Sequence, residues 1–140
     1  MQAMDRMRRI RLYELHPSLS PAEGQLLTII AQQKEGLTVS ALAKALDMPM
    51  PAVSRMMKNL EQRNLLERRI LPQDRRSILV TITPEGEECT EEFLTRLHRF
   101  FHELLQAVDP HDFDKLMQVL NNVMDQMEIV LERQLAEIQP

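Results

Sequence analysis

The chain has 140 residues, 44% of them hydrophobic and 27% charged, with a net charge of −4. This composition fits a single domain with one core and excludes wholesale disorder, and three glycines without a tryptophan argue against a β-sandwich or a glycine-rich nucleotide site. No apolar run approaches the roughly 20 residues that a membrane span needs, and a single cysteine fits a reducing compartment, so we expect a cytoplasmic protein with no membrane partner.

The N-terminal segment from Met1 to Leu15 predicts a first helix, because apolar residues recur at helical spacing with arginines between them. It is expected to pack on later helices, and contact of its basic face with a polyanion stays open as an alternative. His16-Pro17 ends this helix, since the residue before proline is disfavoured in the α region.

A second helix is predicted to begin at a capping box. Ser20 is the N-cap, Pro21 has the φ of a first helical position, and Glu23 can reach back to the cap. Gly36 is the expected stop. The expected buried residues are Leu26, Leu27, Ile29 and Ile30.

Two helices joined by a short turn are predicted next. Thr38 caps the helix Val39 to Leu46, Asp47-Met48-Pro49 forms the turn, and the second helix runs from Met50 to about Arg63. The residues expected to face inward are Val53, Met56 or Met57, and Leu60, and those left outside are Ser54, Arg55, Lys58 and Asn59.

Two strands are predicted after this pair, Leu65 to Ile70 and Ser77 to Ile82. The six residues from Leu71 to Arg76 join them, with two adjacent arginines near the tip. A connection of this length is a wing rather than a tight hairpin.

Two long helices complete the chain. Thr83-Pro84-Glu85 starts a helix that ends near Val108, and Asp109-Pro110 starts the last one. The stripe of the first helix is Leu94, Leu97, Phe101, Leu104 or Leu105, and Val108; that of the second is Phe113, Leu116, Leu120, Val123, Met127, Val130 or Leu131, and Leu135. The second stripe extends farther than one small core can cover, so a symmetric pair of chains is the economical solution and folding back within a monomer is the alternative.

Positive charge is concentrated in the middle of the chain. From Thr38 to Thr83 there are eight basic and four acidic residues, a net charge of +4, whereas the rest of the chain carries −8. A polyanion is therefore expected to dock on the middle segment.

The helix–turn–helix has the layout of a DNA reader. A major groove admits one α-helix, whose N-terminal residues must be small or polar to approach base edges. Arg55 suits guanine, whereas Ser54 and Lys58 suit phosphates equally well. The residues expected at this interface are Met50, Pro51, Ala52, Ser54, Arg55 and Lys58. A helical hairpin with solvated charges is the alternative.

The wing favours the DNA interpretation. Arg75 and Arg76 on a narrow loop suit a minor groove with enhanced negative potential. Asp74 beside them is expected to hold an arginine in a fixed pose.

Several motifs resemble those of the MarR family of bacterial and archaeal transcription regulators. Asp74-Arg75-Arg76 with the following strand resembles the family's wing signature, although Ile82 stands where leucine is usual. The stretch Leu37 to Ala43, the triplet Val53-Ser54-Arg55, and Thr83 to Gly86 are similar to its helix–turn–helix and its junction to the dimerisation region. The resemblance covers nearly the whole chain.

This resemblance implies a mainly α fold with a small β-wing (α+β), in one domain spanning 1–140. The winged helix-turn-helix DNA-binding lobe is 20–83, and 1–15 and 84–140 are dimerisation helices. A homodimer, more often a repressor, would bind double-stranded DNA at a pseudo-palindromic operator, and a small-molecule effector could relieve binding. Arg76 matches the arginine that enters the minor groove, Asp74 the aspartate that positions it, and Ser54 and Arg55 recognition-helix contacts. Two features depart from the family: a short first helix and no side-chain cap at Pro49.

Other functions have weaker support. No nucleophile–base pair, phosphate loop or paired carboxylates predict an enzyme, and we expect no cofactor. His98 and His102 have metal-ligand spacing, and Glu103 or His111 could contribute, but the four ligands that make such a signal specific are not evident. Cys89 follows acidic residues rather than the cationic surroundings that activate a thiol. An architectural DNA binder of low specificity and a winged-helix protein-interaction module remain the two rivals.

Overall fold

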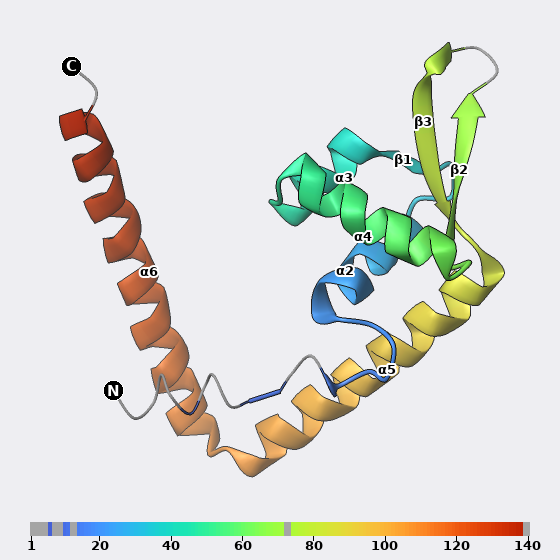
Figure 1. Ribbon diagram of the computed structural model, residues 1–140. Helices are drawn as coiled ribbons and strands as arrows, with labels where there is room; N and C mark the ends of the chain where they lie inside the picture. Colours follow the sequence, from blue (N-terminus) through green and yellow to red (C-terminus); the bar gives the residue numbers. More distant parts are fainter. Residues whose placement is uncertain (1–5, 7–9, 12–13, 72–73, 139–140) are drawn as a thin grey trace. The chain divides into compact units, whose positions relative to one another are not determined.

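Figure 1 shows the computed structural model, which describes residues 6, 10–11, 14–71 and 74–138. The chain forms two compact units, Met1–His98 and Arg99–Pro140. The described elements are α2 (Pro21–Ala31), β1 (Leu37–Thr38), α3 (Val39–Leu46), α4 (Met50–Gln62), β2 (Leu66–Leu71), β3 (Asp74–Ile82), α5 (Pro84–Ala107) and α6 (Pro110–Ile138). The predicted mainly helical fold with a small β-wing is confirmed.

One hydrophobic core holds the first unit together. Leu27 of α2, Leu42 of α3, Met57 of α4 and Val80 of β3 are all fully buried in it. The other buried apolar residues are Leu19, Leu26, Ile30, Ala43, Val53, Leu60, Leu65, Leu66 and Phe93. Because burial of apolar area is the main favourable term in folding, this cluster fixes the three short helices against the sheet.

The helix starts follow the predicted caps. The hydroxyl of Ser20 accepts from the Glu23 N–H at 3.2 Å while the Glu23 carboxylate accepts from the Ser20 N–H at 2.9 Å, which completes the capping box. The hydroxyl of Thr38 accepts from the Ala41 N–H at 3.2 Å at the start of α3. Pro49 provides no side-chain cap for α4, as predicted.

The sheet has three antiparallel strands in the order β1-β3-β2. The sequence did not predict β1, whose two residues pair with Leu79 and Val80 of β3. Gly36 does not end α2, which stops at Ala31. Gly36 instead forms the turn into β1. Its φ of 89° is in the left-handed region that favours glycine, and a side chain at this position would collide with the carbonyl oxygen of Val80.

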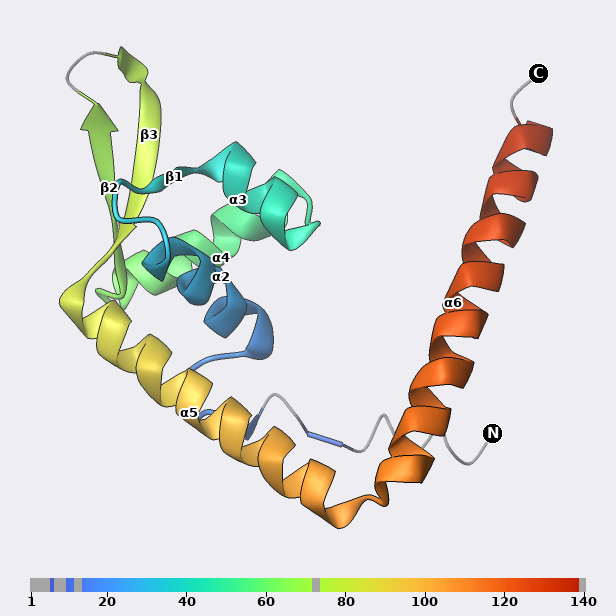
Figure 2. The ribbon, with the colours of Figure 1, turned by 180° about the vertical axis from the view of Figure 1, so that it is seen from behind.

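The wing differs from the predicted six-residue loop. β2 reaches Leu71 and β3 starts at Asp74, and these two residues pair with each other. The register shifts between Ile70 and Leu71, so the pairing at this end of the hairpin is irregular. The expected open loop was wrong because strand pairing satisfies backbone groups that an open loop would leave to solvent. Figures 1 and 2 show the hairpin of β2 and β3 extending beyond α3 and α4.

The predicted first helix lies largely outside the described residues. Arg6 is helical, but Ile10 and Arg11 have no regular structure and Glu14 lies in a 3-10 turn, so the helix does not continue to Leu15 as expected. The chain turns here because buried His16 accepts the backbone N–H groups of Ser18 and Leu19 on its Nδ1 atom.

The two long helices begin where the sequence predicted. Thr83 Oγ1 accepts from the Gly86 N–H at 3.0 Å, and Asp109 Oδ1 accepts from the His111 N–H at 2.8 Å. Phe93 of α5 is buried, although the predicted stripe did not include it, and its neighbours Leu94 and Leu97 are half-buried against the core.

The second unit exposes the predicted apolar stripes. Phe101, Leu104 and Leu105 at the end of α5 are exposed. On α6 the exposed apolar residues are Leu116, Met117, Val119, Leu120, Val123, Met124, Met127, Ile129, Val130, Leu131 and Leu135. Within the described part of the chain, no helix has the length and apolar character needed to cross a membrane.

Candidate nucleic-acid interface

The turn between α3 and α4 sets the pose of the second helix. Asp47 adopts the left-handed conformation with a φ of 50°, and its N–H donates to the carbonyl of Lys44 at 3.2 Å. The Met48 N–H donates to the Ala43 carbonyl at 3.0 Å and closes α3. These bonds end α3 sharply, so that α4 starts in a new direction after a turn of three residues.

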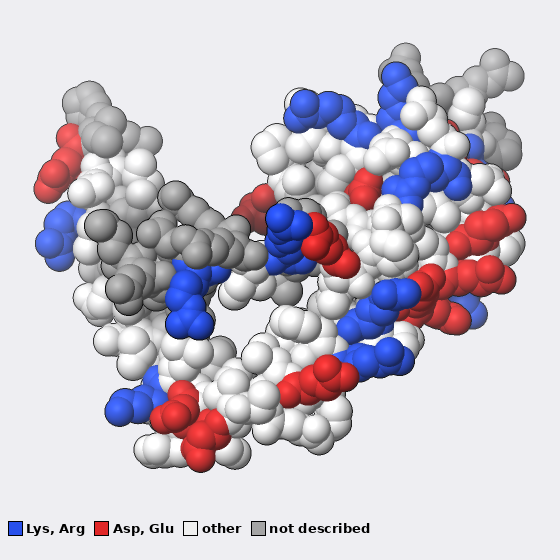
Figure 3. Space-filling model, turned by 60° about the horizontal axis from the view of Figure 1, so that its bottom comes forward, with Lys and Arg blue, Asp and Glu red and all other residues white. Residues whose placement is uncertain are grey.

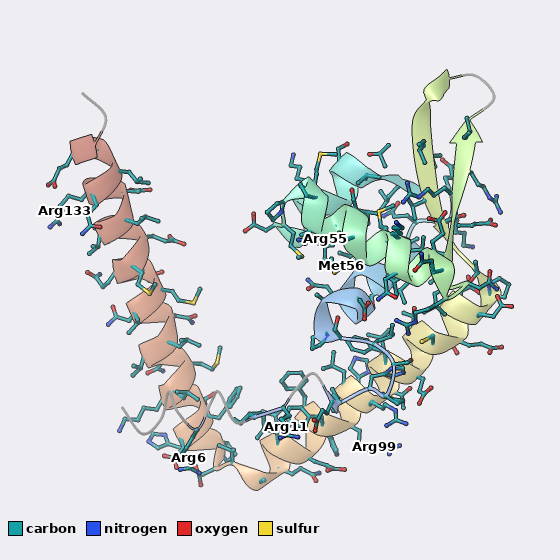
Figure 4. All side chains as sticks on the ribbon, in the orientation of Figure 1. Arg6, Arg11, Arg55, Met56, Arg99 and Arg133 are labelled. Atoms are coloured by element: carbon teal, nitrogen blue, oxygen red, sulfur yellow. The ribbon has the colours of Figure 1, made fainter. Side chains whose placement is uncertain are left out.

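The outer face of α4 carries the predicted contact residues. Ser54, Arg55 and Lys58 are exposed, while Val53, Met57 and Leu60 on the opposite face are buried. Figure 4 labels Arg55 and its half-buried neighbour Met56 on this helix. At its N-terminal end, Met50 and Pro51 are exposed and Ala52 is half-buried. Five of the six predicted α4 residues are thus exposed, and Ala52 is half-buried.

The basic residues from α3 to β2 fall into two groups. One group forms ion pairs: Arg63 with Glu23 at 3.8 Å, Arg68 with Glu61 at 3.1 Å, and Arg69 with Glu67 at 2.6 Å. By contrast, within the described residues, Lys44, Arg55 and Lys58 form no ion pair. Among the residues that the structure describes, the cationic groups of α3 and α4 therefore have no acidic partner to compete with a phosphate.

Acidic residues gather elsewhere on this unit. The first half of α5 exposes Glu85, Glu87, Glu88, Glu91 and Glu92. Figure 3 views the protein from the side of α5 and shows red side chains along this helix, with blue ones among them. The first half of α5 is consequently unsuited to a polyanion, unlike the outer face of α4.

Glu23 positions α4, a role that the sequence did not reveal. One of its carboxylate oxygens completes the capping box of α2, and the other accepts from Asn59 Nδ2 on α4 at 2.8 Å. Arg63, just after α4, approaches the same carboxylate and donates to the Ser18 carbonyl at 2.6 Å. The capping box predicted only the local half of this network, because the partners on α4 lie far away in the sequence.

The wing is tied to the other side of α4. Arg68 Nε on β2 donates to Glu61 Oε2 on α4 at 3.1 Å. Asp74, Arg75 and Arg76 begin β3, so the backbone carries all three at the hairpin end. Their side chains lie outside the described part of the structure, and their expected roles stay predictions.

Metal and redox chemistry gain no support from this geometry. Within the described residues, no group of three or more histidine, cysteine or acidic side chains could hold a metal ion. His98 and His102 are both exposed on α5. Cys89 is half-buried, and its Sγ lies 4.0 Å from the hydroxyl of Ser18.

The fold and this site define a winged helix–turn–helix protein. Residues 19–78 match the sequence model of the MarR family. The chain is 30% identical over 115 residues to the uncharacterized HTH-type transcriptional regulator YdgJ of Bacillus subtilis, a match that covers 79% of this chain and 70% of that protein. The chain belongs to the MarR family, as the sequence motifs predicted.

A second relative and two solved structures agree with this assignment. The transcriptional repressor MprA of Escherichia coli is 32% identical over 113 residues, and the chain spans 64% of its length. The S. aureus MepR structure solved as a DNA complex superposes with a TM-score of 0.73 at 22% identity, covering 89% of this chain and 96% of that one. Bacillus subtilis YusO superposes with a TM-score of 0.65 at 24% identity, covering 89% of each chain. At these identities the solved structures establish the fold.

Proposed function

We propose that this protein is a sequence-specific, double-stranded DNA-binding transcriptional regulator that acts as a homodimer. The observation that carries the proposal is the row of exposed polar and basic residues on α4, in which Arg55 and Lys58 have no acidic partner among the described residues. A recognition helix needs such a face, because phosphates provide affinity and base edges provide specificity. Membership of the MarR family supports the same function.

The proposed contacts divide by chemistry. Arg55 is assigned to a base edge, with Ser54 and Lys58 near the phosphates. Met50, Pro51 and Ala52 form the small or apolar surface at the entry of α4 into the groove. On the wing, Arg75 and Arg76 are assigned to the adjacent minor groove and Asp74 to holding an arginine. Since MprA is named a transcriptional repressor, repression is the mode we propose.

The dimer proposal rests on α6. Leu120, Val123 and Met127 recur at three- and four-residue spacing and are 46%, 47% and 65% exposed. A helix with so continuous an apolar stripe needs a partner surface, and a second copy provides an identical one. We propose that 84–140 together with 1–15 form the dimerisation region of a single domain, next to the DNA-binding lobe 20–83.

Selection of randomised duplex DNA on the purified protein at near-physiological salt tests this function. Enrichment of an inverted repeat with half-site centres about one helical turn apart is the expected result. Recovery of DNA without any enriched sequence would favour the architectural DNA binder, since specificity is a ratio of affinities. No recovery of DNA would favour the protein-interaction module.

We also propose that a small molecule relieves DNA binding. The family supports this, and so does the S. aureus MepR structure solved with bound ethidium bromide, which is similar in fold with a TM-score of 0.55. The ligand would act by binding preferentially to a dimer conformation of lower DNA affinity. A saturating screen of aromatic acids, lipophilic drugs and metals that left duplex affinity unchanged would count strongly against this idea.

A further inference from the structure

An exposed apolar pair lies on the wing. Ile70 of β2 and Ile78 of β3 are paired in register, and their exposed fractions are 64% and 38%. The side chains of a strand alternate between two faces, and the pairing is regular from Leu66 to Ile70. The pair therefore shares a face with Leu66 and Val80, which are buried in the core.

This face is the one directed toward α4. Arg68 lies between Leu66 and Ile70 on the same face of β2, and its hydrogen bond to Glu61 fixes that face on the side of α4. One alternation farther along the hairpin, Ile70 and Ile78 are exposed instead of buried. The hairpin as a whole extends beyond α3 and α4 (Figures 1 and 2). The two isoleucines thus continue the core-facing side of the sheet where it is no longer buried.

Docked DNA would fill the position next to this pair. When a helix occupies the major groove and a wing enters the neighbouring minor groove, one sugar–phosphate strand passes between them. The deoxyribose carbons are the apolar part of that strand. Lys58 of α4 matches its phosphates in charge, and two isoleucines match its sugars.

We propose that Ile70 and Ile78 form an apolar clamp on the deoxyribose rings of the strand between α4 and the wing. The proposal rests on the DNA-binding function proposed above. It assigns a DNA contact to two apolar residues, in addition to the basic residues of α4 and the wing. Burial of apolar side-chain area against the sugars favours binding and releases no counterion. The clamp consequently adds affinity that does not depend on salt concentration.

Substitution by threonine distinguishes a DNA contact of these isoleucines from a purely structural role in the strands. Isoleucine is common in strands for its β-branched shape alone, and Ile70→Thr and Ile78→Thr keep that shape while removing apolar area. With an enriched duplex as the probe, each variant is expected to lose about threefold to tenfold in affinity. The slope of affinity against salt should stay that of the wild type. Gln33→Thr is the control, because Gln33 is exposed in the loop after α2, outside the wing and the proposed dimerisation region.

Hydroxyl-radical footprinting locates the contact, since the radical attacks deoxyribose. The double variant is expected to lose sugar protection beside the minor groove. Guanine N7 atoms in the major groove should stay protected from methylation by dimethyl sulfate. Wild-type affinity of both variants would overturn the proposed clamp. A changed slope of affinity against salt would also overturn it, because it would mean that the substitutions displaced the wing arginines. If the variants changed the oligomeric state but kept wild-type affinity for the duplex, Ile70 and Ile78 would instead be assigned to a contact between protein chains. Failure of the wild type to bind any duplex would refute the proposed function itself.

Discussion

Gly86, in the first turn of α5, lies directly against the backbone carbonyl of Leu65. A Cβ atom at position 86 would overlap this oxygen and also press on Ile82. The contact brings the start of α5 against the segment where α4 ends and β2 begins, and Thr83 reinforces it by donating to the Asn64 carbonyl at 2.7 Å. The junction between the DNA-binding lobe and α5 therefore requires a glycine at position 86.

Gly86→Ala is expected to destabilise the protein by about 3 kcal/mol, because backbone rather than a flexible side chain would have to move. Urea unfolding of the purified variant measures the change. Thr95→Ala is the control, since Thr95 is exposed on the same helix. An alanine variant as stable as the wild type would contradict the close approach.

Glu23→Ala is expected to lower the free energy of unfolding by about 1–3 kcal/mol, since it removes a cap and leaves Asn59 without its acceptor. Asn59→Ala should cost less, about 1 kcal/mol, because Asn59 itself is exposed. A double-mutant cycle with both changes measures their coupling, which we expect at about 0.5 kcal/mol or more. Additive effects would show that the bond between α2 and α4 contributes nothing.

Arg55→Ala and Lys58→Ala are expected to weaken duplex binding. For a phosphate contact, each change should reduce the dependence of log affinity on log salt by about 1. If Arg55 reads a guanine instead, its variant should relax specificity at one base pair with a smaller change of slope. Arg96→Ala is the control, because Arg96 lies on α5 and pairs with Glu92 at 2.8 Å. Unchanged binding by both α4 variants would remove α4 from the interface.

Leu120→Glu and Met127→Glu are expected to dissociate the proposed homodimer, because a carboxylate in an apolar interface is costly to desolvate. Sedimentation velocity measures the change in mass. Gln118→Glu adds the same charge on the polar side of α6 and should leave the dimer intact. Dimers that tolerated both stripe variants would place the interface elsewhere.

Local sequence patterns determined most of the elements. Ser20 with Glu23, Thr38, Thr83 and Asp109 each satisfy backbone N–H groups within three residues of themselves, so their capping bonds can be derived from the sequence alone. Helical spacing likewise predicted that Val53 and Leu60 would be buried while Arg55 and Lys58 stayed outside. These features depend on short-range geometry, which side-chain order encodes directly.

The tertiary structure decided the contacts between distant segments. The second bond of Glu23, the clearance at Gly86, the pairing of β1 with β3 and the exposed face shared by Ile70 and Ile78 each join residues well separated in sequence. Nothing local distinguishes Glu23 from an ordinary capping residue, or Ile70 from an ordinary strand residue. Such relationships depend on how the core orients each element, and that orientation follows from the packing of the whole first unit rather than from any single segment.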